Sequence, residues 1–322
     1  MGEPMQDALT PSDIATFRND GVVCLRGVLS SAWLDRLADG VEENLKSPGP
    51  MAVVYTDDGR TGRYFGDYCN WQRIPALRET AFSSPLAAIA GVLMGASRVQ
   101  LFHEHVLVKE PGTAEVTPWH HDQPYYVAEG EQTASIWVPL DRVEASVCPR
   151  FLAGSHLTRE LYVPRLFKTG APFDGSSGRY RPLEDIDEAA ERDRLRFWSL
   201  APGDVLVFHF RTLHNAPANL SRNRRRVVSF RFLGDDVRYV ERPHKPSPPY
   251  RDMGLDTGRA NVCPRTGSLS CGRPEETTAR PAAICRRRAF FAWRVCDRPP
   301  SHRSPRSSLA GRSQGSSPSK SP

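Results

Sequence analysis

The spacing of hydrophobic positions changes along this chain at about residue 98. Before that point apolar residues recur at helical intervals, as in amphipathic helices that pack one face on a core. Two such helices are predicted at 74–82 and 85–95. The clearest case is the segment 30–47, where one helical face would carry Leu34, Leu37, Ala38, Val41 and Leu45.

The first helix is predicted from the residues at its two ends. In the segment 9–21, Thr10 can serve as the N-cap, Pro11 occupies the first helical position and Gly21 ends the helix. The apolar run that follows, 22–29, predicts a strand. Residues 9–95 are therefore expected to form a helix-rich start.

From residue 98 onward short apolar runs alternate with turn residues, which predicts strands. Because no regular helices separate them, we expect a mainly β fold with helical support, an antiparallel sandwich or barrel over 98–235. The insertion 157–195 has a Gly/Ser run and a predicted charged helix, which suits a mobile lid. The predicted strands are 98–110, 133–143, 150–155, 194–200, 204–210 and 225–234.

The net charge of +6 comes from the end of the chain. Residues 251–322 hold 13 arginines and one lysine against five acidic residues, whereas residues 1–250 hold 29 basic and 32 acidic residues. A basic surface for nucleic acid is therefore not expected on the main domain, 1–250. The tail is rich in Arg, Ser, Pro and Gly, and we predict that it is disordered or is a frameshifted end.

Three features indicate a cytoplasmic protein with no membrane partner. The three cysteines of the main domain are scattered, as is usual in a reducing compartment. No stretch approaches the roughly 20 apolar residues of a membrane span. The first residues lack the basic and apolar regions of a secretory signal. The sequence does not predict an oligomeric state.

The stretch TPWHHDQPYY, residues 117–126, suggests a metal site. In an extended segment the side chains at i and i+2 share a face, so His120 and Asp122 can reach one ion while His121 points away. The best third ligand is His214, which follows a strongly apolar strand and a short turn. Two imidazoles and one carboxylate on one face of a metal are typical of non-haem Fe(II) oxygenases.

The remaining histidines suit other roles. His209 lies inside an apolar strand and is expected in the core or behind the ligands, and His156 is expected to serve a turn. His244 and His302 lie in Pro-rich loops and are expected to be solvated.

Over residues 9–245 the sequence resembles the phytanoyl-CoA dioxygenase family of Fe(II)/2-oxoglutarate oxygenases. The motifs FRNDGVVCLRGVLS, LVKEPG, PWHHDQPYY, SIWVPLDRV, RFLAGSH and APGDVLVFHFRTLHNAPANLSRNRRRVVSFRF occur in the family's order. The resemblance implies a double-stranded β-helix, a jelly-roll or cupin-like barrel. It also implies Fe(II), 2-oxoglutarate and O₂ as cofactor and cosubstrates, with His120, Asp122 and His214 as the metal ligands.

The same resemblance implies the cosubstrate site. The family's 2-oxoglutarate-binding arginine lies eleven residues beyond the distal histidine, which is Arg225 here. Trp137, Lys109 and Ser229 match positions that line the cosubstrate pocket in relatives. The sequence VEASVCPRF departs from the family's Asn-Gly turn, so a loop near the site is expected to differ from that of the family.

The implied reaction is hydroxylation of an aliphatic C–H bond in a small metabolite or an acyl thioester. Related halogenases lack the carboxylate ligand, so the presence of Asp122 favours hydroxylation, although desaturation and ring closure use the same three ligands. Candidates for the substrate pocket are Gln123 and four aromatic residues, the last two from the aromatic run 63–71: Tyr125, Tyr126, Tyr64 and Trp71.

Two other functions stay open. A cupin-type metalloenzyme would use His103 and His105, which share a strand face, together with Glu110. That motif lacks its flanking glycines, and Glu110 lies in a turn. A non-catalytic binding protein could retain the barrel, although all the ligand residues are present.

Overall fold

The structure is a computed structural model that describes residues 9–56, 62–176, 178–250 and 268–270. No helix in these ranges is long and apolar enough to cross a membrane. Most of the predicted tail, including His302, lies outside the described residues. Within the tail, the short strand β14 (Ser268–Ser270) pairs with β4 (Arg98–Lys109).

The first helix, α1 (Pro11–Asp20), begins and ends as predicted. The Thr10 hydroxyl accepts a hydrogen bond from the backbone N–H of Asp13 at 3.1 Å, and the Asp13 carboxylate accepts one from the backbone N–H of Thr10 at 2.8 Å. Gly21 ends the helix with a left-handed φ of 76°. This reciprocal cap satisfies two backbone groups that a helix end leaves open.

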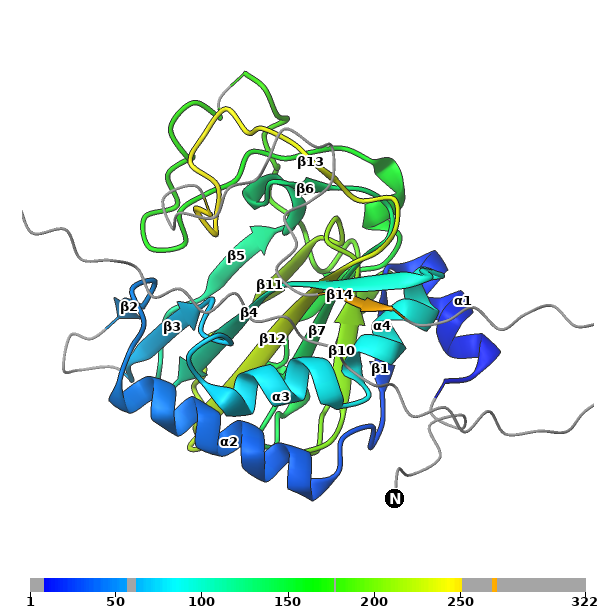
Figure 1. Ribbon diagram of the computed structural model, residues 1–322. Coiled ribbons are helices and arrows are strands. Elements are labelled where there is room, and N and C mark those ends of the chain that lie inside the picture. The colour runs from blue at the N-terminus through cyan, green and yellow to red at the C-terminus, as the bar shows by residue number, and fades with distance from the viewer. Residues whose placement is uncertain (1–8, 57–61, 177, 251–267, 271–322) are drawn as a thin grey trace, which may run out of the picture. The chain divides into compact units, whose positions relative to one another are not determined.

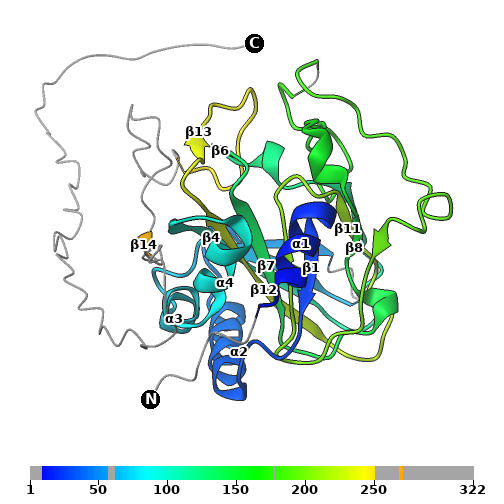
Figure 2. The same ribbon diagram turned by 90° about the vertical axis from the view of Figure 1, so that its right-hand side faces the viewer.

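Three further helices cover the outer face of the large sheet: α2 (Ser31–Lys46), α3 (Pro75–Ser83) and α4 (Leu86–Met94). The predicted apolar face of α2 is confirmed, since Leu37 and Val41 are fully buried in the core that this layer shares with the sheet. Figure 2 shows α2, α3 and α4 on one side of that sheet and the strands of a second sheet on the other.

The large sheet is antiparallel throughout. Its strands lie side by side in an order far from that of the sequence, which brings segments from across the chain together (Figure 1). In spatial order they are β1 (Val22–Leu25), β10 (Val205–Phe208), β7 (Thr133–Pro139), β12 (Arg225–Leu233), β4, β3 (Tyr64–Tyr68) and β2 (Val53–Thr56).

The second sheet faces the large one. Trp137 and Phe208 of the large sheet pack with Phe151 of the second sheet in one apolar cluster between them. A pair of short strands, β6 (Ala128–Glu129) and β13 (Arg238–Tyr239), lies apart from both sheets. In spatial order the second sheet consists of β5 (Thr117–His120), β11 (His214–Ala216), β8 (Arg150–Leu152) and β9 (Leu195–Arg196).

The insertion 157–195 differs from its prediction. No charged helix forms, and residues 188–194 make turns. The Asp187 carboxylate accepts hydrogen bonds from the backbone N–H groups of Ala189 and Ala190, at 3.0 and 3.2 Å, and so stabilises a turn in place of a helix. The strand predicted at 194–200 is likewise reduced to the two residues of β9.

Candidate functional site

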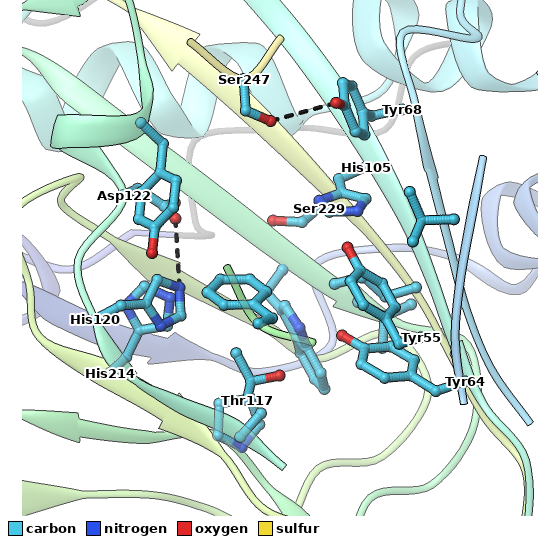
Figure 3. Close-up of a pocket in the computed structure, with 18 of the residues that line it drawn as sticks. Tyr55, Tyr64, Tyr68, His105, Thr117, His120, Asp122, His214, Ser229 and Ser247 are labelled. Carbon is cyan, nitrogen blue, oxygen red and sulfur yellow. Dashed lines mark hydrogen bonds and ion pairs between the residues drawn. The ribbon is translucent and has the colours of Figure 1, made fainter. Parts of the chain in front are cut away.

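His120, Asp122 and His214 meet at one point, and among the described residues they are the cluster whose geometry suits a metal ion. Their candidate ligand atoms all lie within 4.8 Å of one another (Figure 3). His120 ends β5 and His214 begins β11, and the strand register sets these two residues directly opposite each other. Asp122 follows two residues after His120, at the start of the short 3₁₀ helix Gln123–Tyr125.

Backbone carbonyls orient both histidines. The Nδ1 atom of His120 lies 2.8 Å from the Pro118 carbonyl oxygen, and that of His214 lies 2.9 Å from the Thr212 carbonyl oxygen. A proton on Nδ1 therefore leaves Nε2 as the free lone pair on each ring. Burial, with His214 nearby, lowers the pKa of His120 to about 3, so the imidazole is neutral at physiological pH.

The two oxygens of Asp122 have different surroundings. Oδ1 faces the histidines, 3.9 Å from Nε2 of His120. Oδ2 accepts a hydrogen bond from the Ser135 hydroxyl at 3.0 Å and lies 3.7 Å from Nη2 of Arg231. Burial alone would raise the pKa of Asp122, but Arg231, the histidines and Ser135 outweigh it and hold that pKa below its usual value. The carboxylate is therefore ionised, with one oxygen free to bind a cation.

The neighbouring histidines lie outside this cluster. His121 points away, as predicted, and its Nε2 accepts a hydrogen bond from the backbone N–H of Tyr162 at 3.0 Å. His209 is buried beside the Glu131 carbonyl, and His156 lies in the 3₁₀ helix Ser155–Thr158. The prediction that His244 is solvated is wrong: it is 5% exposed, because its loop folds back so that Nε2 lies 2.9 Å from the Pro124 carbonyl oxygen.

Two buried cations, Arg225 and Lys109, line the same cavity between the two sheets as the three candidate ligands. Arg225 of β12 and Lys109 of β4 are direct partners across neighbouring strands. The Arg225 guanidinium donates to the Val147 carbonyl, and the Lys109 ammonium donates to the carbonyls of Glu115 and Pro217, at 2.7 and 3.2 Å. Within the described ranges neither forms an ion pair with a carboxylate. Burial and the adjacent Arg225 lower the pKa of Lys109 to about 6, as expected for a cation without a counter-ion.

The cavity between the sheets has a volume of about 440 Å³ and holds most of the predicted residues. The candidate ligands, the two cations, Trp137 and Ser229 all line it, as do Tyr64, Tyr125 and Tyr126. The other two candidates for the substrate pocket, Gln123 and Trp71, do not line this cavity. Gln123 is fully buried with its amide donating to the Ala128 carbonyl at 3.4 Å, and Trp71 packs against Phe82 in the helical core.

The insertion 157–195 supplies part of the cavity wall. Phe167 packs edge-on against the His120 ring, with 4.7 Å between centroids. The Tyr125 hydroxyl accepts a hydrogen bond from the backbone N–H of Arg165 at 2.8 Å and donates one to the Arg165 carbonyl at 2.9 Å. The sequence predicted the insertion, but gave no signal for these particular contacts.

The alternative site with His103, His105 and Glu110 does not assemble. Glu110 instead forms an ion pair with Arg224 at 2.8 Å, outside the cavity lining. The two histidines do line the cavity, together with Arg231, whose position the sequence analysis missed.

The chain matches a model of the phytanoyl-CoA dioxygenase (PhyH) family over residues 17–227. Among solved structures it resembles the non-haem alpha-ketoglutarate-dependent carbocyclase SnoK from nogalamycin biosynthesis (22% identity, 81% of this chain and 96% of that chain covered, TM-score 0.60). It also resembles the epimerase SnoN in complex with Fe³⁺, alpha-ketoglutarate and nogalamycin RO (23%, 80% and 95%, 0.59). A third similar structure is EvdO2 from Micromonospora carbonacea var. aurantiaca complexed with 2-oxoglutarate (22%, 74% and 96%, 0.54).

These likenesses confirm the predicted double-stranded β-helix, here as two facing antiparallel sheets. The family match covers most of the chain and includes the whole of the candidate metal cluster. The chain therefore belongs to the phytanoyl-CoA dioxygenase family and is an Fe(II)- and 2-oxoglutarate-dependent oxygenase.

Proposed function

We propose that His120, Asp122 and His214 bind the Fe(II) ion of this oxygenase. The donor set fits, since two neutral imidazoles and one carboxylate suit Fe(II) and leave coordination positions open. Their ligand atoms converge from two neighbouring strands and the turn that follows one of them. When bound, Fe(II) would supply O₂-dependent oxidation coupled to the conversion of 2-oxoglutarate to succinate and CO₂.

Arg225 and Lys109 are proposed to hold the far carboxylate of 2-oxoglutarate. The support is the absence of a carboxylate partner for either buried cation within the described residues, in the same cavity as the candidate ligands. A planar guanidinium matches a carboxylate with two parallel hydrogen bonds. Trp137 and Ser229, which are direct partners across β7 and β12, would line the middle of the cosubstrate site.

Ser135 and Arg231 are proposed to keep Asp122 a one-oxygen ligand. Both contact Oδ2, so Oδ1 alone is free to bind a cation. The Tyr126 hydroxyl hydrogen-bonds to both Arg231 and Asp122, and so connects the guanidinium to the ligand carboxylate. Outer contacts of this kind fix the orientation of a ligand and preserve the open positions on the metal.

The proposed reaction is hydroxylation of an aliphatic C–H bond in a small molecule. The carboxylate of Asp122 fills the position that a halide would need, which argues against halogenation. The aromatic residues Tyr125, Phe167 and Phe173 form a wall beside the metal cluster that excludes water from the reacting carbon. The similar structures SnoK and SnoN are a carbocyclase and an epimerase, and ring closure or epimerisation would use the same ligand set.

The observation that carries this proposal is the metal cluster and the unpaired Lys109–Arg225 couple in one cavity. The test is anaerobic titration of the purified protein with Fe(II) and then 2-oxoglutarate. We expect a weak visible charge-transfer band that needs both additions, and O₂-dependent release of succinate. A protein that binds Fe(II) but gives neither the band nor succinate would refute the proposed cosubstrate site.

A further inference from the structure

The cavity wall near Asp122 carries two histidines that the proposed metal and cosubstrate sites do not use. His103 and His105 of β4 lie directly opposite Arg231 and Ser229 of β12. Figure 3 shows His105 and Ser229 side by side, between the metal cluster and the Tyr55 and Tyr68 rings. One ring nitrogen of each histidine, Nδ1 of His103 and Nε2 of His105, is buried without a hydrogen-bond partner in the described structure.

Buried polar atoms are normally hydrogen-bonded, so two of them on one cavity wall indicate a ligand that supplies the missing partners. Tyr68 borders the same wall, with its ring 5.3 Å from that of His105. Its hydroxyl accepts a weak hydrogen bond from Ser247 at 3.3 Å. The wall is therefore built from hydrogen-bonding side chains set among aromatic rings.

The one cation at this end is already engaged. The Arg231 guanidinium donates to the Tyr126 hydroxyl at 2.5 Å and to the Ser229 carbonyl at 3.0 Å, and it lies 3.7 Å from Asp122. Its charge is balanced by the Asp122 carboxylate. The other cations of the cavity are Arg225 and Lys109 at the opposite end, with Arg165 and Lys168 on the exposed surface of the insertion.

The histidines add no charge. Burial and the neighbouring Arg231 lower the pKa of His105 to about 3, and that of His103 lies well below its usual value for the same reasons. A neutral imidazole offers one donor and one acceptor. A hydroxyl group can accept a hydrogen bond from the imidazole N–H or donate one to the other ring nitrogen. A carboxylate can only accept, and it would be repelled by the nearby Asp122 carboxylate.

The size of the cavity sets a second limit. Its volume of about 440 Å³ lies near the low end for a drug-sized ligand, and 2-oxoglutarate must share it. The part of the substrate that lies inside is therefore comparable to a single substituted ring or a short chain.

We propose that His103 and His105 bind hydroxyl or carbonyl oxygens of the substrate, and that the substrate is a small, uncharged, oxygen-bearing ring compound and not a CoA thioester. This inference rests on the proposed function, because it takes the Arg225 end to be filled by 2-oxoglutarate. It divides the cavity into an anion-binding end at Lys109 and Arg225 and a neutral, hydrogen-bonding wall at His103 and His105, farther along the same strands.

The test uses the full chain loaded with Zn(II) and saturating 2-oxoglutarate, so that no turnover occurs. Binding of trans-cyclohexane-1,2-diol, cyclohexanecarboxylate and hexanoyl-CoA is measured by saturation-transfer NMR. The first two probes share a ring and differ in charge. We expect the diol to bind, and its affinity to fall about tenfold in His105→Phe but by less than about threefold in His105→Gln, which keeps a donor and an acceptor.

Thermal unfolding of the two variants shows whether each is folded, and His103→Phe provides the same test from the neighbouring position. Stronger binding of the carboxylate or of hexanoyl-CoA than of the diol would overturn the inference. So would failure of the diol to bind, or diol binding that is equal in His105→Phe and the unaltered protein. Calorimetric titration of 2-oxoglutarate into the same Zn(II) protein is run first, and failure there would refute the proposed function and not this inference alone.

Discussion

Two buried arginines on one strand face mark the two ends of the cavity, and their surroundings are opposite. Arg225 and Arg231 both lie on β12 and are 6% exposed. Arg231 has a carboxylate partner in Asp122 and a phenol partner in Tyr126. Arg225 has only the Val147 carbonyl among its described hydrogen-bond partners.

The difference appears in the energetics of each charge. Burial lowers the pKa of both guanidiniums, but Tyr126 and Asp122 reverse the effect at Arg231, whose pKa is raised. At Arg225 burial prevails and the pKa is lowered. A buried charge without a counter-ion is costly, so it is retained where a ligand supplies the opposite charge. Arg231 therefore belongs to the protein's own network, whereas Arg225 has no counter-ion among the described residues, as expected of the proposed carboxylate-binding residue.

The largest effect should come from removing a candidate metal ligand. We expect His120→Ala, Asp122→Ala and His214→Ala each to abolish turnover and to weaken Fe(II) binding, because each removes one of three ligands. His121→Ala is the matched control, since His121 faces the Tyr162 backbone. Iron content after desalting measures the effect, and loss of iron from His121→Ala with retention in His120→Ala would show that the strand register is wrong.

The next effect separates the two arginines. Arg225→Ala should leave Fe(II) bound and raise the 2-oxoglutarate requirement at least about a hundredfold, because loss of a buried carboxylate partner costs about 3–5 kcal/mol. Titration of 2-oxoglutarate against the iron-loaded variant measures this shift.

The neighbouring arginines provide matched controls for that titration. Arg224 and Arg226 lie on the other face of β12, are partly exposed, and each forms an ion pair with Glu42 at 3.1 Å. Neither side chain lines the cavity, so Arg224→Ala and Arg226→Ala should change the 2-oxoglutarate requirement only slightly. A large loss in either control, with little in Arg225→Ala, would place the cosubstrate on the other face of β12.

Arg231→Met should produce the opposite pattern. Without the guanidinium, Oδ2 of Asp122 keeps the hydrogen bond from the Ser135 hydroxyl, so we expect Fe(II) affinity to fall by about 10- to 100-fold while 2-oxoglutarate affinity of the metal-loaded protein changes little. Ser135→Ala should give a smaller loss of the same kind. Metal titration with a competing chelator distinguishes the two arginines, and a selective loss of 2-oxoglutarate binding in Arg231→Met would exchange their roles.

The sequence predicted what depends on local spacing. The Thr10 cap needs only neighbouring residues, and the two-residue face rule separates His120 and Asp122 from His121. The family spacing placed Arg225, and the same period of two, continued along the strand, would have placed Arg231 on the cavity face as well. The partner of Arg231 could not be predicted in this way, because Asp122 follows β5 of the second sheet and meets Arg231 through the packing of the two sheets.

Other errors have the same origin in long-range packing. An aromatic residue near a pocket motif can belong to the cavity or to the core, and Trp71 belongs to the core because α3 brings Phe82 against it. His244 is buried because its loop returns to Pro124, a contact that the Pro-rich composition does not reveal. The predicted charged helix has favourable residues, yet Asp187 stabilises turns there.

The smallest effect concerns the pH dependence of the anion-binding end. In the folded protein without a ligand the pKa of Lys109 is about 6, against 10.5 in an exposed lysine. Between these values the folded state binds fewer protons than the unfolded chain, so this group makes the ligand-free protein more stable as pH rises from 6 toward 10.5.

A bound carboxylate favours the charged lysine and raises its pKa, so binding of 2-oxoglutarate takes up a proton. Affinity should therefore fall by up to about tenfold for each pH unit above 7 until the pKa of the bound state is reached. Calorimetry in two buffers of different ionisation enthalpy measures the proton uptake, and Lys109→Met should bind more weakly at pH 7 but with a nearly flat pH profile. A flat profile in the unaltered protein would mean that Arg225 alone holds the carboxylate.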